Sequence, residues 1–323
     1  MKLEARLLAL LQQSPEGCSG QALSREMGVS RSAVWKHVNR LREAGYEITS
    51  APGRGYALRR GYLDAAAITR HLTTRTVGRE IYIGATVSST NDRAREQSGQ
   101  AGDGAVFCAE RQLQGRGRLG RTWDSPMGEG LFMSVLQYPA LPPMQVMGLT
   151  LCAGLAVCRG IEDVTGVHAM IKWPNDIVLE GKKLCGILAE MQAEAERIVH
   201  VVIGIGINVN QEAFPEELSQ KGISLRQATG RAWDRNALAA AVCNRLEEYE
   251  ELLFRGAFPM AEYRERCVTL HREVRVCSVA GEYAARAVEV TENGELVVEL
   301  PDGSRKTVGA GEVSVRGLFG YAE

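Results

Sequence analysis

The stretch Gly115-Arg-Gly-Arg-Leu-Gly-Arg121 places three arginines and three glycines in one short loop, directly after the strand-like run 105–110. Arginine offers fixed, planar N–H donors for phosphate and carboxylate oxygens. Glycine lets backbone N–H groups approach a ligand closely and leaves the loop free to rearrange. This composition predicts a loop that closes over an anionic ligand.

Two familiar phosphate-binding motifs overlap this loop. Gly115, Gly117 and Gly120 satisfy the dinucleotide pattern G-x-G-x-x-G, and with the next two residues the loop comes within one residue of a Walker A motif. Both motifs require a helix to begin at the loop. Residues 123–130 instead hold a proline and two glycines, with no helical period. We therefore favour a phosphate-closing loop of another kind, with a solvated basic surface loop as the plainer alternative.

The overall composition is that of an ordinary globular chain. Its 323 residues, 45% hydrophobic and 24% charged, are enough for two or three domains. We find no signal-peptide pattern, and the longest apolar stretch, 146–158, is too short to span a bilayer and predicts a buried helix. The eight cysteines form no C-x-x-C pair, and the histidines show no metal-ligand spacing. We expect buried thiols in a reducing cytoplasm, with no membrane, disulfide or protein-held metal.

Charge separates the first sixty residues from the rest. Residues 1–60 hold 10 Lys and Arg against 5 Asp and Glu, while the remainder holds 28 against 34. A basic module on an acidic body predicts a polyanionic partner. Hydrophobic spacing predicts helices over 3–11, 20–27 and 31–44, the last two each preceded by a capping serine. These two helices and their short turn form a helix-turn-helix.

The third of these helices carries donors of the types that bind phosphates and base edges in a major groove. The candidates for DNA contact there are Ser30, Arg31, Ser32, Trp35, Lys36 and Arg40. Two short strands, 46–50 and 55–59, then predict a hairpin wing with Arg54 at its tip. We predict a DNA-binding winged helix-turn-helix domain over residues 1–60, and keep a module for protein contacts as the alternative.

A polar turn opens the central region, which follows a predicted linker at 60–64. A strand over 80–85 leads through Ser89, Thr90 and Asn91 into a helix that we expect to start near Arg93. Small polar side chains at a strand-to-helix turn serve as N-caps. Three in a row also suit recognition of a polar, uncharged group.

The remainder of the central region predicts an antiparallel sheet. Four strand-like segments have connections too short for helical crossovers, at 169–173, 176–179, 183–191 and 198–209. Gly204 and Gly206 inside the last of them predict close approach by a ligand or another backbone. A long helix, 236–254, and a shorter one ending near Cys267 complete this region. From His271 onward, Asn-Gly and Asp-Gly turns predict a small β-barrel or sheet.

Together these motifs resemble the bifunctional biotin protein ligases, the biotin-operon repressors, over essentially the whole chain. The matching features are the winged helix-turn-helix, Ser-Thr-Asn at 89–91, Gln112, GRGRLGR with Trp123, KWPND at 172–176, Lys183 with Gly186, Gly-Ile-Gly-Ile-Asn at 204–208, and 311–317. The resemblance implies an α+β multidomain fold. Its parts are the winged module, a class II synthetase-like mixed or antiparallel sheet with flanking helices over 65–268, and an SH3-like β-barrel over 271–323.

The resemblance also implies a two-step reaction and a second role in transcription. Biotin and ATP with Mg²⁺ give biotinyl-5′-AMP, and a lysine amine on the biotin carboxyl carrier protein of acetyl-CoA carboxylase then takes the biotin. The first step brings a carboxylate to an α-phosphate, so positioned cations and excluded water assist it and no protein nucleophile is required. The bound adenylate is expected to act as co-repressor by favouring a homodimer on two operator half-sites.

The site residues implied by the resemblance form two overlapping groups. The biotin group comprises Ser89, Thr90, Asn91, Gln112, Gly115, Arg116, Gly117, Arg118, Lys183, Gly186, Leu188 and Ile207. The ATP and phosphate group comprises Arg118, Arg121, Lys172, Asn175, Asp176, Lys183 and Asn208, with Arg118 and Lys183 as the catalytic pair. Two positions depart from the family: Leu119 stands where some members carry arginine, and Ile223 where some carry an aromatic residue that stacks on adenine.

Three other functions stay open on the sequence. The chain is alternatively a ligand-responsive winged-helix transcription factor with a non-catalytic ligase-like domain. It is alternatively a lipoate or octanoate ligase of related fold, which needs no group that recognises a ureido ring. In the third case the ligase is active and the N-terminal module is only a structural brace.

Overall fold

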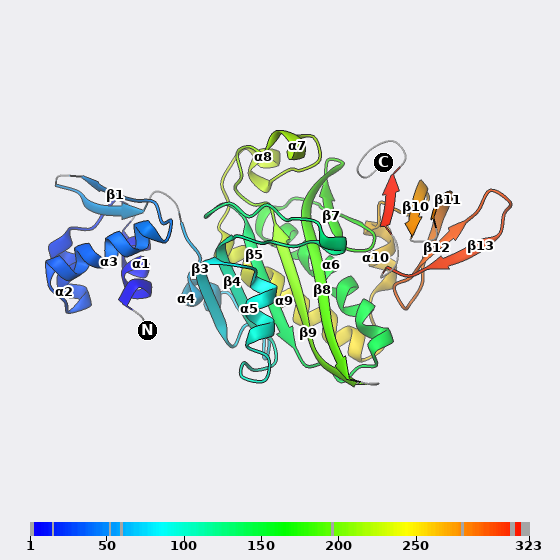
Figure 1. Cartoon of the computed structure of the whole chain (residues 1–323), viewed down its shortest axis with the longest axis horizontal. Coiled ribbons are helices and arrows are strands. Elements are labelled where there is room, and N and C mark those ends of the chain that lie inside the picture. Colours follow the sequence, from blue (N-terminus) through cyan, green and yellow to red (C-terminus); the bar gives the residue numbers. More distant parts are fainter. Residues whose placement is uncertain are drawn as a thin grey trace.

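The computed structural model describes residues 3–14, 16–51, 53–58, 61–194, 197–278, 281–310 and 314–317. An N-terminal helical module, a central domain and a C-terminal sheet follow one another in a row (Figure 1). The helix-turn-helix, the mixed central sheet and the antiparallel C-terminal sheet confirm the predicted fold class at that level. No helix within the described ranges is long and apolar enough to cross a membrane.

The N-terminal module has the predicted order of elements. These are α1 (Leu3–Gln12), α2 (Gly20–Met27), α3 (Arg31–Glu43), β1 (Ile48–Ala51) and β2 (Gly55–Leu58). Ser19 and Ser30 cap α2 and α3 by accepting backbone N–H groups of the first turn, and Gly28 ends α2 in the left-handed conformation at φ 66°. Leu7, Leu23 and Val34 are fully buried, so one face of each helix forms the core.

The central domain is built on a seven-stranded sheet in the order β3-β4-β5-β9-β8-β7-β6. The strands are β3 (Ile81–Val87), β4 (Ala105–Gln112), β5 (Leu131–Gln137), β6 (Met170–Lys172), β7 (Asp176–Leu179), β8 (Lys182–Glu194) and β9 (Arg197–Ile207). β3 and β4 pair parallel, and the other pairs are antiparallel. The predicted antiparallel arrangement of β6 to β9 is therefore confirmed.

Helices cover both faces of this sheet. α5 (Thr90–Glu96) packs on one face, and α6 (Val146–Thr165) and α9 (Arg235–Phe254) pack together on the other (Figure 1). The shorter helical elements are α4 (Ala65–Thr69), η1 (Arg118–Gly120), η2 (Pro143–Gln145), α7 (Glu216–Ser219), α8 (Leu225–Thr229) and α10 (Met260–Arg266). The sheet and α6 and α9 enclose the main hydrophobic core.

The start of α5 corrects the sequence prediction. The helix begins at Thr90, not near Arg93, so Thr90 and Asn91 belong to its first turn. Ser89 occupies the N-cap position without a side-chain cap bond. The helix can begin at Thr90 because a side chain of the sheet caps it: Gln112 Oε1 accepts the N–H of Thr90 at 2.9 Å.

The glycines of β9 are approached closely by side chains, and approach by a ligand stays a prediction. A Cβ atom on Gly204 would lie 2.2 Å from Asn91 Oδ1, and one on Gly206 would lie 2.6 Å from Trp123 Nε1. What approaches these glycines is therefore a pair of side chains, not a second backbone. This packing places Asn91 and Trp123 directly on the sheet.

The chain that joins the N-terminal module to the central domain is buried at two of its described residues. Tyr62 and Leu63 are 1% and 4% exposed. The N–H of Glu47 donates to Tyr62 Oη at 2.7 Å, and the rings of Tyr46 and Tyr62 meet edge-on with centroids 4.5 Å apart. Tyr62 therefore belongs to the core of the N-terminal module. Residue 60 of the predicted linker lies outside the described ranges.

A buried ion pair of the central domain contacts this joining segment. Arg235, at the start of α9, lies 2.7 Å from Glu110 of β4, and both side chains are at most 2% exposed. The Arg235 guanidinium also donates to the carbonyls of Gly61 and Gly130, each at 3.0 Å. We call this group of four residues the linker clamp. Close to it, Met127 packs on the core of the N-terminal module.

The C-terminal region forms an antiparallel sheet in the order β13-β12-β11-β10-β14. Its strands are β10 (Glu273–Ser278), β11 (Gly281–Val290), β12 (Leu296–Glu299), β13 (Arg305–Val308) and β14 (Ser314–Gly317). The described residues show no pairing that closes this sheet, so the SH3-like barrel stays a prediction. Residues 311–313 of the family-like segment 311–317 lie outside the described residues.

Most of the cysteine thiols lie inside the fold. Six of the eight cysteines are buried. Burial raises the pKa of Cys108 and of Cys158 to about 12, which keeps both thiols protonated and unreactive.

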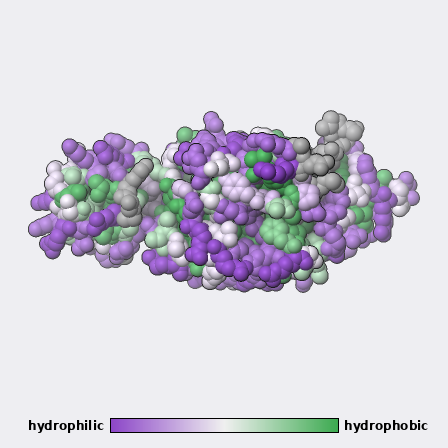
Figure 2. All heavy atoms as spheres, turned by 90° about the horizontal axis from the view of Figure 1, so that it is seen from below, coloured by the Kyte–Doolittle hydropathy of each residue, from purple (hydrophilic) through white to green (hydrophobic). Residues whose placement is uncertain are grey.

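On the outside, polar residues cover most of the face seen in Figure 2, with a small hydrophobic patch on the central domain.

A carboxyl group is buried near the C-terminal end of α9. Glu250 is 4% exposed, and Gln137 Nε2 donates to its two oxygens at 2.8 and 2.7 Å. The amide of Gln137 carries no charge, so burial dominates and raises the pKa of Glu250 to about 8. The folded protein therefore holds this proton more tightly than the unfolded chain does.

We expect this proton to make stability depend on pH. Its contribution is fully present below about pH 4.5 and is lost as the pH rises to about 8, because the folded state binds the proton more tightly over that range. Glu250→Gln should flatten this dependence and raise the free energy of unfolding at pH 8 by roughly 2–4 kcal/mol. Urea titrations at several pH values measure it. Glu248→Gln, on the same helix in an exposed pair with Arg245, should keep the original slope. An unchanged slope in Glu250→Gln would refute the assignment.

Candidate functional site

A cluster of uncharged polar side chains lies at the junction of α5 and the sheet. Gln112 Oε1 lies 3.1 Å from Thr90 Oγ1, and Gln112 Nε2 donates to Ser125 Oγ at 3.0 Å. Ser134 Oγ lies 2.7 Å from Thr90 Oγ1 and 2.6 Å from Asn91 Oδ1. The network fixes the orientation of each donor and acceptor, as a site for a polar, uncharged group requires.

Asn91 extends this cluster towards β8. Its Nδ2 donates to the carbonyl of Leu188 at 3.3 Å and to Glu190 Oε2 at 2.7 Å. Ser89, Thr90 and Asn91 are each no more than 5% exposed. The structure thus brings together the predicted residues 89–91, Gln112 and Leu188, and it adds Ser134 and Glu190 to them.

The arginine-rich loop folds back on itself beside this cluster. The N–H of Gly117 donates to the carbonyl of Arg121 at 2.7 Å, Arg116 forms an isolated bridge with Thr122, and the N–H of Trp123 donates to the carbonyl of Gly115 at 2.8 Å. Leu119 at the tip has φ 57° and is 66% exposed. A left-handed leucine is strained, which is typical of loops with a functional role.

Trp123 connects the loop to the glycines of the sheet. Gly186 and Gly206 are register partners in β8 and β9, and a Cβ on either would lie within 3.1 Å of the Trp123 ring. Lys183 Nζ lies 5.2 Å from the centre of that ring. Trp123 Nε1 is buried and has no hydrogen-bond partner within the described part of the chain. This aromatic surface joins the uncharged cluster to a charged region.

The charged region is formed by the KWPND turn and the start of β8. Lys183 Nζ lies 2.6 Å from Asp176 Oδ1. Arg118 donates to Asn175 Oδ1 at 3.0 Å and also to the carbonyl of Ala310, which precedes β14. Burial lowers the pKa of Arg118 and the charge of Asp176 opposes that shift. A basic, partly dehydrated region of this kind suits phosphate and carboxylate oxygens.

The other predicted site residues lie around these two regions. Lys172 is buried and pairs with Asp176 in the β6–β7 register, and Asn208 Nδ2 donates to the carbonyl of Lys183 at 3.4 Å. Ile207 is fully buried at the end of β9. Arg121 differs from the other loop arginines because its side chain is exposed. The side chain of Arg116 turns away from the charged region and binds Asp92.

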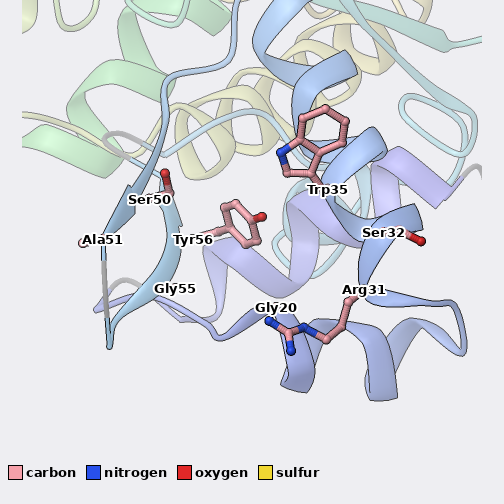
Figure 3. Close-up of a pocket in the computed structure, with 8 residues that line it drawn as sticks. All are labelled: Gly20, Arg31, Ser32, Trp35, Ser50, Ala51, Gly55 and Tyr56. Carbon is pink, nitrogen blue, oxygen red and sulfur yellow. The ribbon is translucent and has the colours of Figure 1, made fainter.

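A second candidate surface lies on the N-terminal module. A hollow of about 640 Å³ separates α3 from the wing. It is lined by Arg31, Ser32 and Trp35 of α3, Gly20 of α2, and Ser50, Ala51, Gly55 and Tyr56 of the wing (Figure 3). Trp35 is 54% exposed at this surface, although aromatic side chains are usually buried.

Not every predicted DNA-binding residue lies in this hollow. Arg40 is 3.3 Å from Glu4 of α1, so part of its charge is already paired within the protein. Ser30 uses its side-chain oxygen to cap α3. Lys36 and Arg54 are exposed but do not line the hollow. Arg31, Ser32 and Trp35 thus line the hollow, and DNA contact by the whole predicted set stays a prediction.

Comparison with known protein families gives three consecutive matches. Residues 4–57 match a helix-turn-helix domain, residues 83–208 the biotin/lipoate A/B protein ligase family, and residues 269–316 the biotin protein ligase C-terminal domain. The biotin protein ligase of Aquifex aeolicus, solved in complex with biotin and ATP, is 31% identical with a TM-score of 0.65, over 74% of this chain and 99% of that one.

Curated relatives cover the chain nearly end to end. The bifunctional ligase/repressor BirA of Bacillus subtilis is 37% identical over 95% of this chain and 97% of its own length. That of Escherichia coli is 32% identical over 96% of each. The chain belongs to the bifunctional ligase/repressor family. This membership confirms the resemblance inferred from the GRGRLGR and KWPND motifs.

For this ligase/repressor chain, sequence reasoning left four residues near the loop out of the proposed site. They are Asp92, Trp123, Ser134 and Glu190. Trp123 had a usable signal, because two glycines that pair across neighbouring strands leave room for one aromatic ring. Asp92, Ser134 and Glu190 had none, since their contacts join segments that are far apart in the sequence.

Proposed function

We propose that this chain is an ATP-dependent biotin protein ligase and a biotin-responsive repressor. In the first step the biotin carboxylate attacks the α-phosphorus of ATP and pyrophosphate leaves, giving biotinyl-5′-AMP. In the second step a lysine amine of biotin carboxyl carrier protein attacks the acyl carbon and AMP leaves. Family membership and the fold shared with the biotin- and ATP-bound ligase of A. aeolicus support this activity.

The main support for this activity is that the groups around Trp123 change from uncharged to cationic from one end of the site to the other. At one end the Thr90, Asn91 and Gln112 cluster offers uncharged donors and acceptors, which match a ureido ring. At the other end Lys183 and Arg118 offer cations, which match a carboxylate and phosphates. A molecule with a neutral polar head, an apolar body and an acidic tail fits this order.

We assign the remaining predicted residues by their place along the site. The backbone of Gly115, Arg116 and Gly117, with Ser89, faces the ureido end, and Gly186, Leu188 and Ile207 line the apolar body. Arg121, Lys172, Asn175 and Asn208 join Arg118 and Lys183 at the phosphate end. Asp176 supplies the kind of oxygen ligand that Mg²⁺ prefers, which suits ATP taken as its Mg²⁺ complex.

The chemistry follows from charge and exclusion of water. Two anions must meet in the first step, and the ammonium of Lys183 and the guanidinium of Arg118 lower their repulsion. Closing the arginine-rich loop over the acyl phosphate keeps water from it. No side chain needs to form a covalent intermediate, since the site binds and orients both reactants.

The ligase activity is tested by transfer of labelled biotin to purified carrier protein. Label should reach the carrier only when ATP and Mg²⁺ are both present, and pyrophosphate should be released before transfer. Biotin binding without pyrophosphate release would identify a non-catalytic, ligand-responsive transcription factor instead. Competition in which lipoate displaces biotin would favour the lipoate ligase alternative.

We propose that α3 and the wing bind operator DNA in the cytoplasm, as a homodimer that forms when biotinyl-5′-AMP is bound. The hollow between α3 and the wing presents a cation, a hydroxyl and an exposed aromatic ring, which are groups that bind phosphates and base edges. The test is a randomised duplex library, with retained sequences compared with and without biotin and ATP. Enrichment only with both ligands supports repression. No enrichment would make the module a structural brace.

The two sides of α3 should contribute unequally to DNA binding. Arg31→Ala should weaken binding by about 1–3 kcal/mol and reduce the salt dependence, because it removes a cation from the hollow. Arg40→Ala, which removes the same charge from the same helix, should have a smaller effect because Glu4 already pairs with Arg40. Fluorescence anisotropy over a salt series measures both variants. Equal effects would show that the hollow does not define the DNA surface.

A further inference from the structure

Arg116 is held by two acidic residues, Asp92 and Glu190, and Glu190 also accepts a hydrogen bond from Asn91. The two terminal nitrogens of Arg116 donate to both carboxylate oxygens of Asp92, at 2.9 and 2.7 Å, and Glu190 lies 3.7 Å away. Arg95 of α5 also pairs with Asp92 from within the helix. The Asp92 side chain is 15% exposed and that of Arg116 35%. A two-point contact between a guanidinium and a carboxylate fixes direction as well as distance.

The three loop arginines therefore differ in their surroundings. Arg118 reaches Asn175 at the KWPND turn, and Arg121 is exposed. Arg116 is already paired, and hydrogen bonding from Arg116 lowers the pKa of Asp92, so this carboxylate stays charged. The side chain of Arg116 is thus occupied within the protein, which leaves its backbone as the part that faces a ligand.

The position of Asp92 determines which parts of the fold its contact with Arg116 connects. Asp92 lies in the first turn of α5, directly after Thr90 and Asn91 of the uncharged cluster. Arg116 lies at the base of the loop, where its bridge with Thr122 closes the turn. The ion pair thus ties the base of the loop to the element that carries the uncharged cluster.

We propose that Asp92, assisted by Glu190, is a positioning residue that keeps the arginine-rich loop closed through Arg116. It touches neither substrate nor reacting atoms. Loss of its charge frees the base of the loop, so the loop opens more often and a bound acyl-adenylate escapes before it meets the carrier. The consequence for the adenylate rests on the proposed function, whereas the effect on the loop does not.

The loop itself supplies a direct test, because trypsin cleaves after arginine. The full-length ligand-free chain is digested briefly, and cleavage after Arg118 and Arg121 is followed by mass spectrometry. Asp92→Asn should speed cleavage at these two sites by roughly tenfold, in line with loss of a charged hydrogen bond. Glu96→Gln is the control for loss of a carboxylate from α5, because it breaks an exposed pair with Arg93 on the same helix. Asp92→Glu, which keeps the charge, should stay near the unmodified rate.

The effect of salt distinguishes an Asp92–Arg116 ion pair that holds the loop from a general loosening of α5. Added NaCl should speed cleavage of the unmodified chain and of Glu96→Gln relative to each chain at low salt. It should speed cleavage of Asp92→Asn less, since only the longer contact of Arg116 with Glu190 is left there to screen. Equal cleavage in Asp92→Asn and Glu96→Gln would overturn the proposal. So would an equal salt response in the unmodified chain and Asp92→Asn.

A second measurement addresses the adenylate. Labelled biotinyl-5′-AMP is added directly, and its dissociation is timed after a chase with unlabelled compound, so adenylate synthesis is not needed. Dissociation should be roughly tenfold faster from Asp92→Asn and unchanged in Glu96→Gln. Dissociation as slow as that from the unmodified chain would contradict the role of Asp92. If the trypsin digestions give the expected result while the unmodified chain transfers no biotin, the proposed function is wrong and the positioning role of Asp92 stands.

Discussion

Replacing Lys183 with methionine should slow formation of the adenylate by roughly 10²–10³-fold, the range seen when one donor that stabilises developing charge is removed. Lys183 Nζ lies 2.6 Å from Asp176 and 5.2 Å from the centre of the Trp123 ring, where the carboxylate and the α-phosphate are expected to meet. Methionine keeps the length and the apolar stem of the side chain but carries no charge. The loss should therefore appear in the rate of pyrophosphate release more than in the affinity for biotin.

The neighbouring residue provides the control for this experiment. Lys182→Met makes the same change one position earlier in β8, and successive side chains of a strand point to opposite faces. We expect this variant to retain its activity. A Lys183→Met rate within about threefold of the unmodified rate would show that this ammonium does not stabilise the reacting charges.

Replacing Arg235 with methionine should lower the free energy of unfolding by about 3–5 kcal/mol, as is typical when one partner of a buried ion pair is removed. Glu110 would then keep a negative charge that is fully buried, without its cation. The carbonyls of Gly61 and Gly130 would each lose a donor as well. Urea titrations at neutral pH measure the change.

Two further variants show whether the loss of stability in Arg235→Met is specific to the buried ion pair or follows from removing any arginine. Arg245→Met breaks a pair with Asp163 that is a third or more exposed, and should cost less than about 1 kcal/mol. Adding Glu110→Gln to Arg235→Met should recover part of the lost stability, because no charge is then left buried alone. If Arg235→Met and Arg245→Met cost the same, the linker clamp contributes no special stability.

Local features of the fold were predictable because their causes are local. Ser19 and Ser30 begin helices through contacts within a few residues, and both were predicted from the sequence as capping serines. The antiparallel order of β6 to β9 followed from short connections. Such signals need no knowledge of tertiary structure.

Features that depend on distant contacts were mispredicted or missed. The start of α5 moved to Thr90 because Gln112, on the next strand, satisfies its N–H. The contact of Arg40 with Glu4 was missed because nothing in the sequence near Arg40 shows that Glu4 approaches it. At the site, the family motifs identified the loop, the KWPND turn and Lys183, but the partner of Arg116 required coordinates.

The linker clamp joins the N-terminal module and the central domain through one buried cation. The guanidinium of Arg235 donates to the backbone at Gly61, which leads from the N-terminal module, and at Gly130, in the segment that runs from the arginine-rich loop into β5. The two carbonyls therefore share a single donor group, so a change that displaces Gly130 also disturbs the support of Gly61.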